Sequence, residues 1–428
     1  MAGDGLLSVY RASGRALAPL FSGLLHLRAL RGKEDPHRRG ERYGKPSLPR
    51  PAGRLVWIHA ASVGETNSVL PLIARLIGAG AKVLLTTGTV TSARLAAQRL
   101  PAGALHQFVP LDIAPYVTRF LDHWRPDLVL FVESELWPTT LSLLAARGLA
   151  PVLVNGRMSV RSHRRWRQLG GLRSAIFGRL GEVLAQTDDD AARFADLGVG
   201  RVTATGNLKF DAPALVLHDR DLATLRAAID RRPVWLAAST HPGEEDIAAD
   251  VHHRLADRLP RLLTVIVPRH PERGGDIATE LARQGHRVAR RSLGEVPGDE
   301  TDIYLADTLG ELGLFYRLVP VAFLGGSLVE RGGQNPIEAA RLDCVILHGP
   351  KVENFKQVYA AFDATGAGIA IADAGALAAE VAGILTDPQA HQPRIEAGRR
   401  VIDQHSGALE RTVAALADRM RDDHGSDR

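Results

Sequence analysis

The sequence has almost no cysteine, and this absence limits both its crosslinks and its metal sites. Among 428 residues Cys344 is the one cysteine, so an internal disulfide cannot form and a disulfide-stapled secreted domain is excluded. A cysteine-rich zinc or iron–sulfur site is excluded on the same ground, and no His-Glu-x-x-His segment offers another kind of zinc site. We therefore expect a protein of a reducing compartment that needs no metal and no cofactor.

Two nucleotide-binding signatures are also missing. No Gly-x-Gly-x-x-Gly opens a helix after a strand, which argues against a dinucleotide-dependent dehydrogenase, and no Gly-x-x-x-x-Gly-Lys-Ser/Thr is present, which excludes P-loop chemistry. Residues 188–190 have the Asp-x-Asp spacing of a metal-bound sugar nucleotide site. Because Thr187 precedes them and a helical pattern follows, we favour their interpretation as the capped first turn of a helix.

The N-terminal apolar stretch is short for a membrane span. In the first 30 residues, the longest run without Asp, Glu, Lys or Arg covers residues 16–27, which is 12 residues, whereas a spanning helix needs about 20. The basic residues that follow it are Arg28, Arg31, Lys33, Arg38, Arg39 and Arg42. The pattern fits an interfacial helix on an anionic membrane surface, and equally an amphipathic helix packed on the body of the protein.

The composition is that of a globular protein with an uneven set of basic residues. The chain is 45% hydrophobic and 24% charged, and its length suggests two or three domains. Its net charge of +5 is carried by 47 arginines and only six lysines. The planar guanidinium of arginine binds phosphate and carboxylate groups through two hydrogen bonds better than lysine does, so this excess fits anionic partners. A GC-rich genome, whose codons favour arginine, produces the same composition.

Apolar runs alternate with helical patterns along most of the chain, which is typical of parallel sheets covered by helices on both faces. The first series of runs lies at 55–59, 82–86, 128–132, 151–154, 183–185 and 202–205. After a less patterned stretch, the second series lies at 234–238, 262–267, 287–289, 302–305, 321–324, 344–347 and 368–371. We predict an α/β protein with two Rossmann-like domains of about 200 residues each, whose ligand site lies in the cleft beyond the carboxyl ends of the strands.

Carboxylates follow two predicted strands of the first domain. In His59-Ala-Ala-Ser-Val-Gly-Glu65-Thr66, Glu65 stands at the start of a helix, where it fits a general base and equally a capping acid. Glu133 and Glu135 follow the strand at 128–132 and would share one face if the chain stayed extended. The pair fits carboxylates that perturb each other's pKa, and equally one solvated acid and one helix cap.

Two basic residues stand at similar positions. Lys209, one of the six lysines, lies at the predicted junction between the first and second domains. Its ammonium group can bind an anion as a point charge, or it can be a solvated ion-pair partner of Asp211. Arg269 follows a strand in Val267-Pro268-Arg269-His270-Pro271, where the prolines stiffen the loop. Arg269 fits a residue that binds a phosphate through two hydrogen bonds, and equally a solvated loop residue.

The richest segment is 323–340. A buried strand runs into a glycine pair at 325–326, and a second pair at 332–333 precedes a helix that begins near Pro336. Glycines let backbone amides approach a phosphate, and Glu338 in the first turn of the helix can hold a ribose diol. With residues 307–312 just upstream, this segment predicts a nucleotide site without a metal.

In this order the motifs resemble those of the Kdo (3-deoxy-D-manno-octulosonic acid) transferases of lipopolysaccharide assembly, which have the two-domain GT-B glycosyltransferase fold. The matching stretches, which cover nearly the whole chain, are 40–44, 59–66, 133–138, 155–159, 205–211, 239–245, 267–273, 307–312, 323–340 and 349–350. The N-terminal segment departs from the family because arginines interrupt its apolar anchor.

The resemblance implies a domain division and a location. It implies an N-terminal membrane-associated helix and basic segment at 1–50, a Rossmann-like acceptor domain at 51–210, and a Rossmann-like CMP-sugar domain at 211–428. The implied location is the cytoplasmic face of the cell inner membrane, on its anionic surface, and no nucleic-acid partner is implied.

The resemblance also implies a reaction and its residues. Kdo would pass from CMP-Kdo to a hydroxyl of the lipid A precursor, lipid IVA, with inversion and without a metal. Glu65 matches the family's general base, and Glu133 and Lys209 match positions that support the transition state, with Glu135 as the alternative to Glu133. The matches to the CMP-binding segments are Pro268, Arg269, Leu309, Gly310, Glu311, Asn335, Pro336, Ile337 and Glu338.

Two other functions remain open at this point. The same fold serves enzymes of UDP-sugars, either a transferase or an enzyme like UDP-N-acetylglucosamine 2-epimerase. A non-catalytic protein that binds anionic membranes or nucleic acid is the second alternative, and it would bind in a strongly salt-dependent way.

Overall fold

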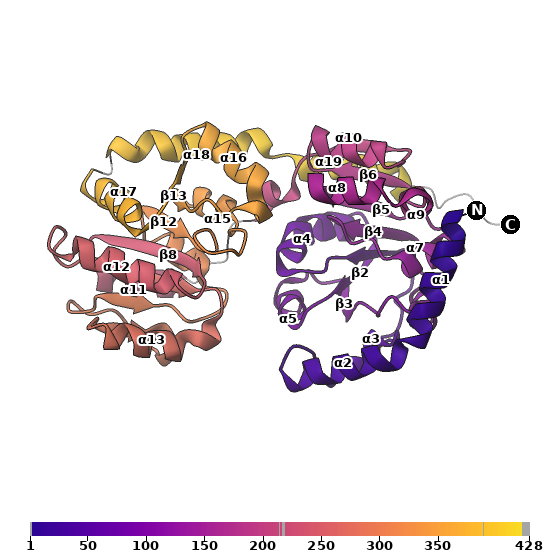
Figure 1. Cartoon of the computed structure of the whole chain (residues 1–428), viewed down its shortest axis with the longest axis horizontal. Coiled ribbons are helices and arrows are strands. Elements are labelled where there is room, and N and C mark those ends of the chain that lie inside the picture. Colours follow the sequence, from indigo (N-terminus) through magenta and orange to yellow (C-terminus); the bar gives the residue numbers. More distant parts are fainter. Residues whose placement is uncertain (1, 214, 216–218, 388, 422–428) are drawn as a thin grey trace. The chain divides into compact units, whose positions relative to one another are not determined.

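The computed structural model describes residues 2–213, 215, 219–387 and 389–421 (Figure 1). The chain divides into two compact units, and each contains a sheet of seven strands. The first unit comprises Met1–Ala212 and His405–Arg428, and the second comprises Pro213–Gln404. The first unit is therefore built from two separate stretches of the chain.

The strands of the first sheet run parallel in the order β3-β2-β1-β4-β5-β6-β7. The strand order reverses between β1 and β4, which pair directly, and ligands in such sheets bind beyond the carboxyl ends of the strands at this reversal. The strands are β1 (Leu55–His59), β2 (Lys82–Thr87), β3 (Ala104–Phe108), β4 (Leu128–Val132), β5 (Val152–Gly156), β6 (Glu182–Ala185) and β7 (Val202–Ala204).

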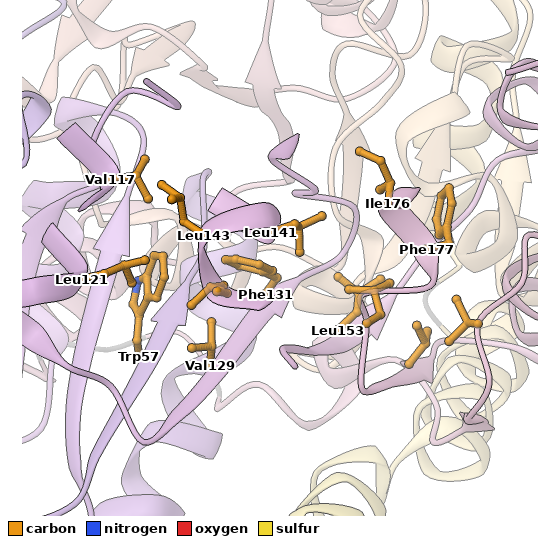
Figure 2. Packing of buried hydrophobic residues seen from close by; sticks show 14 of the residues in the cluster. Trp57, Val117, Leu121, Val129, Phe131, Leu141, Leu143, Leu153, Ile176 and Phe177 are labelled. Carbon is orange, nitrogen blue, oxygen red and sulfur yellow. The ribbon is translucent and has the colours of Figure 1, made fainter. Parts of the chain in front are cut away.

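Alternate side chains of these strands enter two different hydrophobic clusters, one on each face of the sheet. Leu55 and Trp57 of β1 belong to one cluster, whereas Val56 and Ile58 belong to the other. Figure 2 shows part of the first cluster, in which the Trp57 and Phe131 rings are 5.6 Å apart edge to face. Burial on both faces explains why these strands are continuous apolar runs.

The helices of the first unit surround this sheet. They are α1 (Ala2–Ala16), α2 (Ala18–Leu30), α3 (Arg39–Arg42), α4 (Val63–Gly78), α5 (Val90–Arg99), α6 (Ala114–Trp124), α7 (Pro138–Ala145), α8 (Val160–Arg167), α9 (Gly170–Phe177), α10 (Asp188–Asp196) and α19 (Ala408–Arg421), with the short 3₁₀ helix η1 (Leu208–Asp211).

The second sheet has the same kind of order, β10-β11-β9-β8-β12-β13-β14, and its strands also run parallel. Its order reverses between β8 and β12. The strands are β8 (Val234–Thr240), β9 (Leu263–Pro268), β10 (Val288–Arg290), β11 (Ile303–Leu305), β12 (Val321–Leu324), β13 (Val345–His348) and β14 (Gly368–Ala370). The helices are α11 (Asp219–Ile229), α12 (Glu244–Ala256), α13 (Gly274–Arg283), α14 (Leu312–Tyr316), α15 (Pro336–Ala340), α16 (Lys356–Ala364), α17 (Ala374–Thr386) and α18 (Gln392–His405).

The two parallel sheets confirm the predicted Rossmann-like series, although strand β3 was not predicted. Strand β3 is not a continuous apolar run, because His106 and Gln107 interrupt it. Their polar atoms are satisfied by distant residues: Trp124 Nε1 donates to Gln107 Oε1 at 2.9 Å, and His106 Nε2 lies 2.9 Å from Thr87 Oγ1. The strand therefore depends on partners that a local pattern does not show.

The end of the chain belongs to the first unit, which differs from the expected domain 211–428. Helix α19 packs against α4 and η1, and its Leu416 is buried in the same hydrophobic cluster as Val69 of α4. The Asp211 carboxylate accepts the backbone N–H groups of Gly407 and Leu409 at 2.7 and 2.6 Å. These contacts hold the returning chain where the first stretch ends.

The N-terminal segment forms two helices that differ in their packing contacts. Helix α1 packs against α6, α7 and α9, and its Leu7 is part of the core. Helix α2 buries only Leu25 among its residues. Within the described part of the chain, none of the helices has the length and apolar character needed to cross a bilayer.

Candidate active site

Three carboxylates predicted from the sequence meet at the reversal point of the first sheet. Glu65 lies in the first turn of α4, just after β1, and Glu133 and Glu135 follow β4. Because β1 and β4 are neighbours with parallel register, their carboxyl ends lie at one edge of the sheet. The negative charges of Glu133 and Glu135 both raise the pKa of Glu65, as expected for carboxylates that share one site.

Glu65 is held by a reciprocal capping arrangement. The Ser62 hydroxyl accepts the backbone N–H of Glu65 at 3.3 Å and donates to Glu65 Oε1 at 2.8 Å. The backbone N–H of Ala61 donates to Glu65 Oε2 at 2.8 Å. The capping interpretation is thus correct, and it leaves further lone pairs on both oxygens, since a carboxylate offers about four acceptor positions.

The Glu65 carboxyl is also tuned towards neutral pH. Burial is the main cause that raises its pKa to about 7, followed by the charge of Glu133, while the hydrogen bonds from Ser62 and Ala61 act in the opposite direction. A carboxylate with such a pKa can accept a proton and release it again near neutral pH.

Glu133 forms a tight ion pair with the lysine at the end of the first domain. Lys209 Nζ lies 2.6 Å from Glu133 Oε1, with side chains only 13% and 15% exposed. Lys209 reaches this place from η1, whose backbone is fixed by two asparagines: Asn155 Oδ1 accepts the N–H of Leu208 and Asn207 Oδ1 accepts the N–H of Lys209, each at 3.0 Å. Asp211, the alternative partner of Lys209, accepts backbone amides of the returning chain.

Glu133 and Glu135 do not share an extended strand, which corrects the sequence-based expectation. Glu133 has a left-handed backbone with φ +58°, so the chain turns immediately after β4. That conformation costs a non-glycine residue about 1–2 kcal/mol, and such strain clusters at functional sites. The turn sends the two carboxylates to different partners.

Glu135 faces His59, a residue whose side chain the sequence analysis did not assign to the site. Glu135 Oε2 lies 3.9 Å from His59 Nε2, and the histidine is fully buried at the end of β1. His59 Nδ1 lies 3.1 Å from the Thr86 carbonyl oxygen, and burial lowers the pKa of His59 to about 4. Burial also raises the pKa of Glu135. The feature of the sequence that could have pointed to His59 is that it is a histidine in an otherwise apolar strand.

In the second unit, arginines gather at the carboxyl edge of β8 and β9. Arg269 follows Pro268 at the end of β9, its side chain is exposed, and its backbone N–H donates to the Thr240 carbonyl at 2.9 Å. Next to Thr240, His241 is buried, and its pKa is lowered to about 4 by burial and then by the nearby charges of His270, Arg331, Arg269 and Arg273. This edge of the second sheet is therefore positive, which suits an anionic ligand.

The glycine-rich loop after β12 differs from the expected phosphate cradle. Glu244, which is fully buried, accepts the backbone N–H groups of Gly326, Ser327 and Leu328 at 2.6, 3.1 and 3.1 Å. It also accepts the N–H of His241 at 3.0 Å. An internal carboxylate already accepts these three amides, so in this structure they are not free to approach a phosphate, while the ligand role of the second glycine pair stays a prediction. The glycines serve close packing: a Cβ on Gly325 would lie 2.5 Å from the Ser239 carbonyl oxygen.

The remaining predicted nucleotide residues lie in two further places of the second unit. Leu309 and Gly310 form an exposed turn, with Gly310 at φ +85°, and Glu311 pairs with Arg291 at 2.6 Å. Asn335 caps α15, since its Oδ1 accepts the N–H of Ile337 at 3.2 Å. Buried Pro336 and half-buried Glu338 belong to the first turn of this helix. The ligand role of both groups stays a prediction.

The acidic run at 188–190 has the capping role that the sequence favoured. The Thr187 hydroxyl accepts the N–H of Asp190 at 3.1 Å, and the three acids form the first turn of α10. Among the described residues, no group of three or more His, Cys, Asp or Glu side chains is arranged to hold a metal ion.

Comparison with known proteins identifies relatives along nearly the full length. A family model described as 3-deoxy-D-manno-octulosonic-acid transferase (kdotransferase) matches residues 37–212. The 3-deoxy-D-manno-octulosonic acid transferase of Bordetella pertussis is 38% identical over 425 residues, which is 96% of this chain and 98% of the relative.

Solved structures with low sequence identity share the fold. A glycosyltransferase from Rickettsia africae covers 87% of this chain and 100% of its own at TM-score 0.57 and 11% identity. UDP-GlcNAc 2-epimerase from Neisseria meningitidis covers 86% and 100% at TM-score 0.58 and 14% identity. With the two parallel sheets, these likenesses confirm the GT-B fold class.

Proposed function

Since the chain belongs to the 3-deoxy-D-manno-octulosonic acid (Kdo) transferase family, we propose that it transfers Kdo from CMP-Kdo to a hydroxyl group of the lipid A precursor, with inversion. In this reaction the acceptor oxygen forms a bond to the anomeric carbon while the bond from that carbon to the phosphate oxygen breaks. CMP leaves with the electron pair of the broken bond, and the proton of the acceptor hydroxyl goes to a base on the protein.

We propose Glu65 as that base. The observation that carries the assignment is its geometry: a rigid carboxylate at a helix start, with unused lone pairs on both oxygens and a pKa raised to about 7. Near neutral pH about half of such a group is ionised and ready to accept a proton, and its protonated form is a weak enough acid to hold that proton through the step.

The Glu133–Lys209 pair supports the same site. Glu133 is ion-paired with Lys209, and its negative charge raises the pKa of Glu65. Lys209 also places a positive charge at this edge of the sheet, where it can stabilise negative charge on the reacting groups. Glu133 is thus the stronger candidate for direct support of catalysis, while Glu135 is turned towards His59.

The positive edge of the second unit supports an anionic donor. Arg269 is fixed by its backbone to the end of β8 and has an exposed guanidinium that makes no hydrogen bond or ion pair with the described residues. A guanidinium matches the geometry of a phosphate group, and it provides the charge that a leaving phosphate requires.

We further propose that α2 lies in the interface of an anionic membrane, on the cytoplasmic face of the inner membrane. Its exposed apolar residues recur every three or four positions, which places them along one side of the helix. They are Leu20, Phe21, Leu24, Leu27 and Leu30, and exposed Leu17 at the N-cap continues the row. Exposed Arg31 and Lys33 follow directly, and each basic residue near an anionic surface contributes about 1 kcal/mol of attraction.

The assignment is tested with the purified protein, CMP-Kdo and lipid IVA, and with Glu65→Gln as the variant. Glutamine also completes a capping box, so this variant keeps the helix start and loses only the base. We expect wild-type protein to produce Kdo-modified lipid and Glu65→Gln to lose at least a hundredfold in kcat with an unchanged melting temperature. A fully active Glu65→Gln protein would contradict the role of Glu65.

The donor is tested separately by thermal unfolding with nucleotides. CMP should raise the melting temperature, because a ligand that binds the folded state stabilises it. Protection by UDP but not by CMP would instead favour a UDP-sugar enzyme, for which the epimerase and transferase of the same fold provide precedents in architecture alone.

A further inference from the structure

The donor of the proposed reaction carries two anionic groups, the phosphate and the carboxylate of the sugar acid. The second unit would ordinarily offer backbone amides of a glycine-rich loop to such groups. Here the amides of residues 326–328 donate to the buried Glu244 carboxylate. Because these three amides are engaged, side chains are the next groups to consider for the recognition of two anions at this edge.

Three arginines contribute positive charge next to His241, and they differ in what they already bind. Arg273 is committed to Glu245, with two hydrogen bonds of 2.9 and 3.3 Å. Arg269 and Arg331 are both exposed, and the guanidinium of neither makes a hydrogen bond or ion pair with the described residues. Two guanidinium groups thus remain available for two anions.

The backbone of Arg331 is firmly placed although its guanidinium is unengaged. A Cβ added to Gly326 would lie 3.2 Å from Arg331 Cβ and 3.2 Å from His241 Cδ2, so Arg331 and His241 both lie close to Gly326. The Arg331 carbonyl accepts a hydrogen bond from Asn354 Nδ2 at 2.9 Å. Gly332 and Gly333, at φ +81° and +75°, turn the chain back so that the N–H of Gly333 donates to the Gly326 carbonyl at 2.8 Å.

Arg331 and Arg269 are therefore fixed on two different loops that both adjoin His241. Arg269 is tied to Thr240 by its backbone, and its neighbour His270 places its ring 5.8 Å from that of His241. His241 itself is buried and stays neutral near pH 7, since its pKa is lowered to about 4. The positive charge offered to a ligand at neutral pH thus comes from the arginines.

We propose that Arg331 binds the carboxylate of the donor sugar acid, and so selects a sugar-acid nucleotide over a neutral sugar nucleotide, while Arg269 binds the phosphate. This assignment rests on the proposed function. A planar guanidinium forms two parallel hydrogen bonds with a carboxylate, a geometry that lysine does not reproduce and that a neutral sugar does not satisfy.

The experiment compares two ligands that differ in the sugar acid. Wild-type turnover of CMP-Kdo is established first, because its absence would refute the proposed function and not the role of Arg331. The KM for CMP-Kdo and the inhibition constant for CMP, which has the phosphate but no sugar carboxylate, are then measured for Arg331→Ala, Arg331→Lys and Arg269→Ala. Arg258→Ala, an exposed arginine after α12, is the matched control.

We expect Arg331→Ala to raise the KM for CMP-Kdo at least tenfold, as loss of a charged hydrogen-bond pair implies, and to leave CMP inhibition within twofold of wild type. Arg331→Lys should recover part of the loss, and Arg269→Ala should weaken both ligands. Equal weakening of CMP and CMP-Kdo by Arg331→Ala would overturn the assignment, because Arg331 would then serve the phosphate. An effect confined to the KM of the lipid acceptor, or no effect at all, would overturn it as well.

Discussion

Glu244 should hold the second unit together at the carboxyl edge of its sheet. Its Oε1 accepts the N–H groups of Ser327 and Leu328, and its Oε2 accepts those of His241 and Gly326. Substitution by glutamine keeps one carbonyl oxygen and replaces the other by an NH₂ group, which donates and does not accept. Two of the four amides therefore lose their acceptor whichever way the new side chain turns.

The magnitude follows from the burial of these groups. A buried donor without a partner costs about 1–3 kcal/mol, so two of them lower the free energy of unfolding by at least about 2 kcal/mol in Glu244→Gln. Glu244→Ala leaves all four donors unpaired and should cost about 4 kcal/mol or more by the same reasoning. Local opening of the loop should be favoured by the same amount, and about 2 kcal/mol corresponds to a change of about 30-fold in an equilibrium.

Hydrogen exchange followed by mass spectrometry measures this directly. The peptide that contains residues 326–328 should exchange about 30-fold faster in Glu244→Gln than in wild type, and the urea midpoint should fall. Asp246→Asn is the matched control, because Asp246 lies in the same helical turn and is exposed. Unchanged exchange of this peptide in Glu244→Gln would refute the argument that the carboxylate, and no ligand, satisfies these amides.

Three further outcomes are expected. The kcat/KM of the wild type should rise between pH 6 and pH 8 with an apparent pKa near 7, because Glu65 accepts a proton only when ionised, and a flat profile would exclude it as the base. In initial-rate measurements, Lys209→Met should lower kcat at least tenfold, because it leaves the half-buried Glu133 carboxylate without its ion-pair partner. Lys209→Arg should restore part of the lost kcat. A wild-type kcat for Lys209→Met would contradict this role of Lys209. In flotation with anionic vesicles, the double variant Leu20→Asp, Leu24→Asp should shift to the unbound fraction. The control variant Leu293→Asp changes an exposed leucine of the second unit and should not shift. If the double variant still floats with the vesicles, the membrane contact lies elsewhere.

The alternation of strands and helices was predictable because it is local. A strand buried on both faces must be a continuous apolar run, so β1 and β4 were found with their observed limits. The carboxylates at their ends were noticed for the same reason, since an acid directly after such a run is hard to place in a core. Strand β3 was missed because Gln107 and His106 become acceptable in a sheet only through partners distant in sequence.

The misinterpreted part of the site depended on long-range contacts. Glycine pairs before a helix suggest free amides, and nothing near them in the sequence reveals that Glu244, more than 80 positions earlier, accepts those amides. Likewise the extended course expected after β4 fails at Glu133, where a left-handed backbone is maintained by surrounding structure and not by its residue type. Local patterns thus located the strands and their ends, whereas the partners of the glycine-rich loop and the turn after β4 depend on contacts between distant segments.

The return of the chain to the first unit affects the order in which the protein can be completed. Ribosomes deliver the chain from its N-terminus, and domains generally fold as they emerge. The first sheet is complete after β7, yet α19 and the two amides that bind Asp211 arrive only after all of the second unit. During synthesis of nearly 200 residues, the apolar surface of α4 that receives α19 remains uncovered. A chain that stops before α19 therefore leaves exposed the apolar surface of α4 that this helix covers.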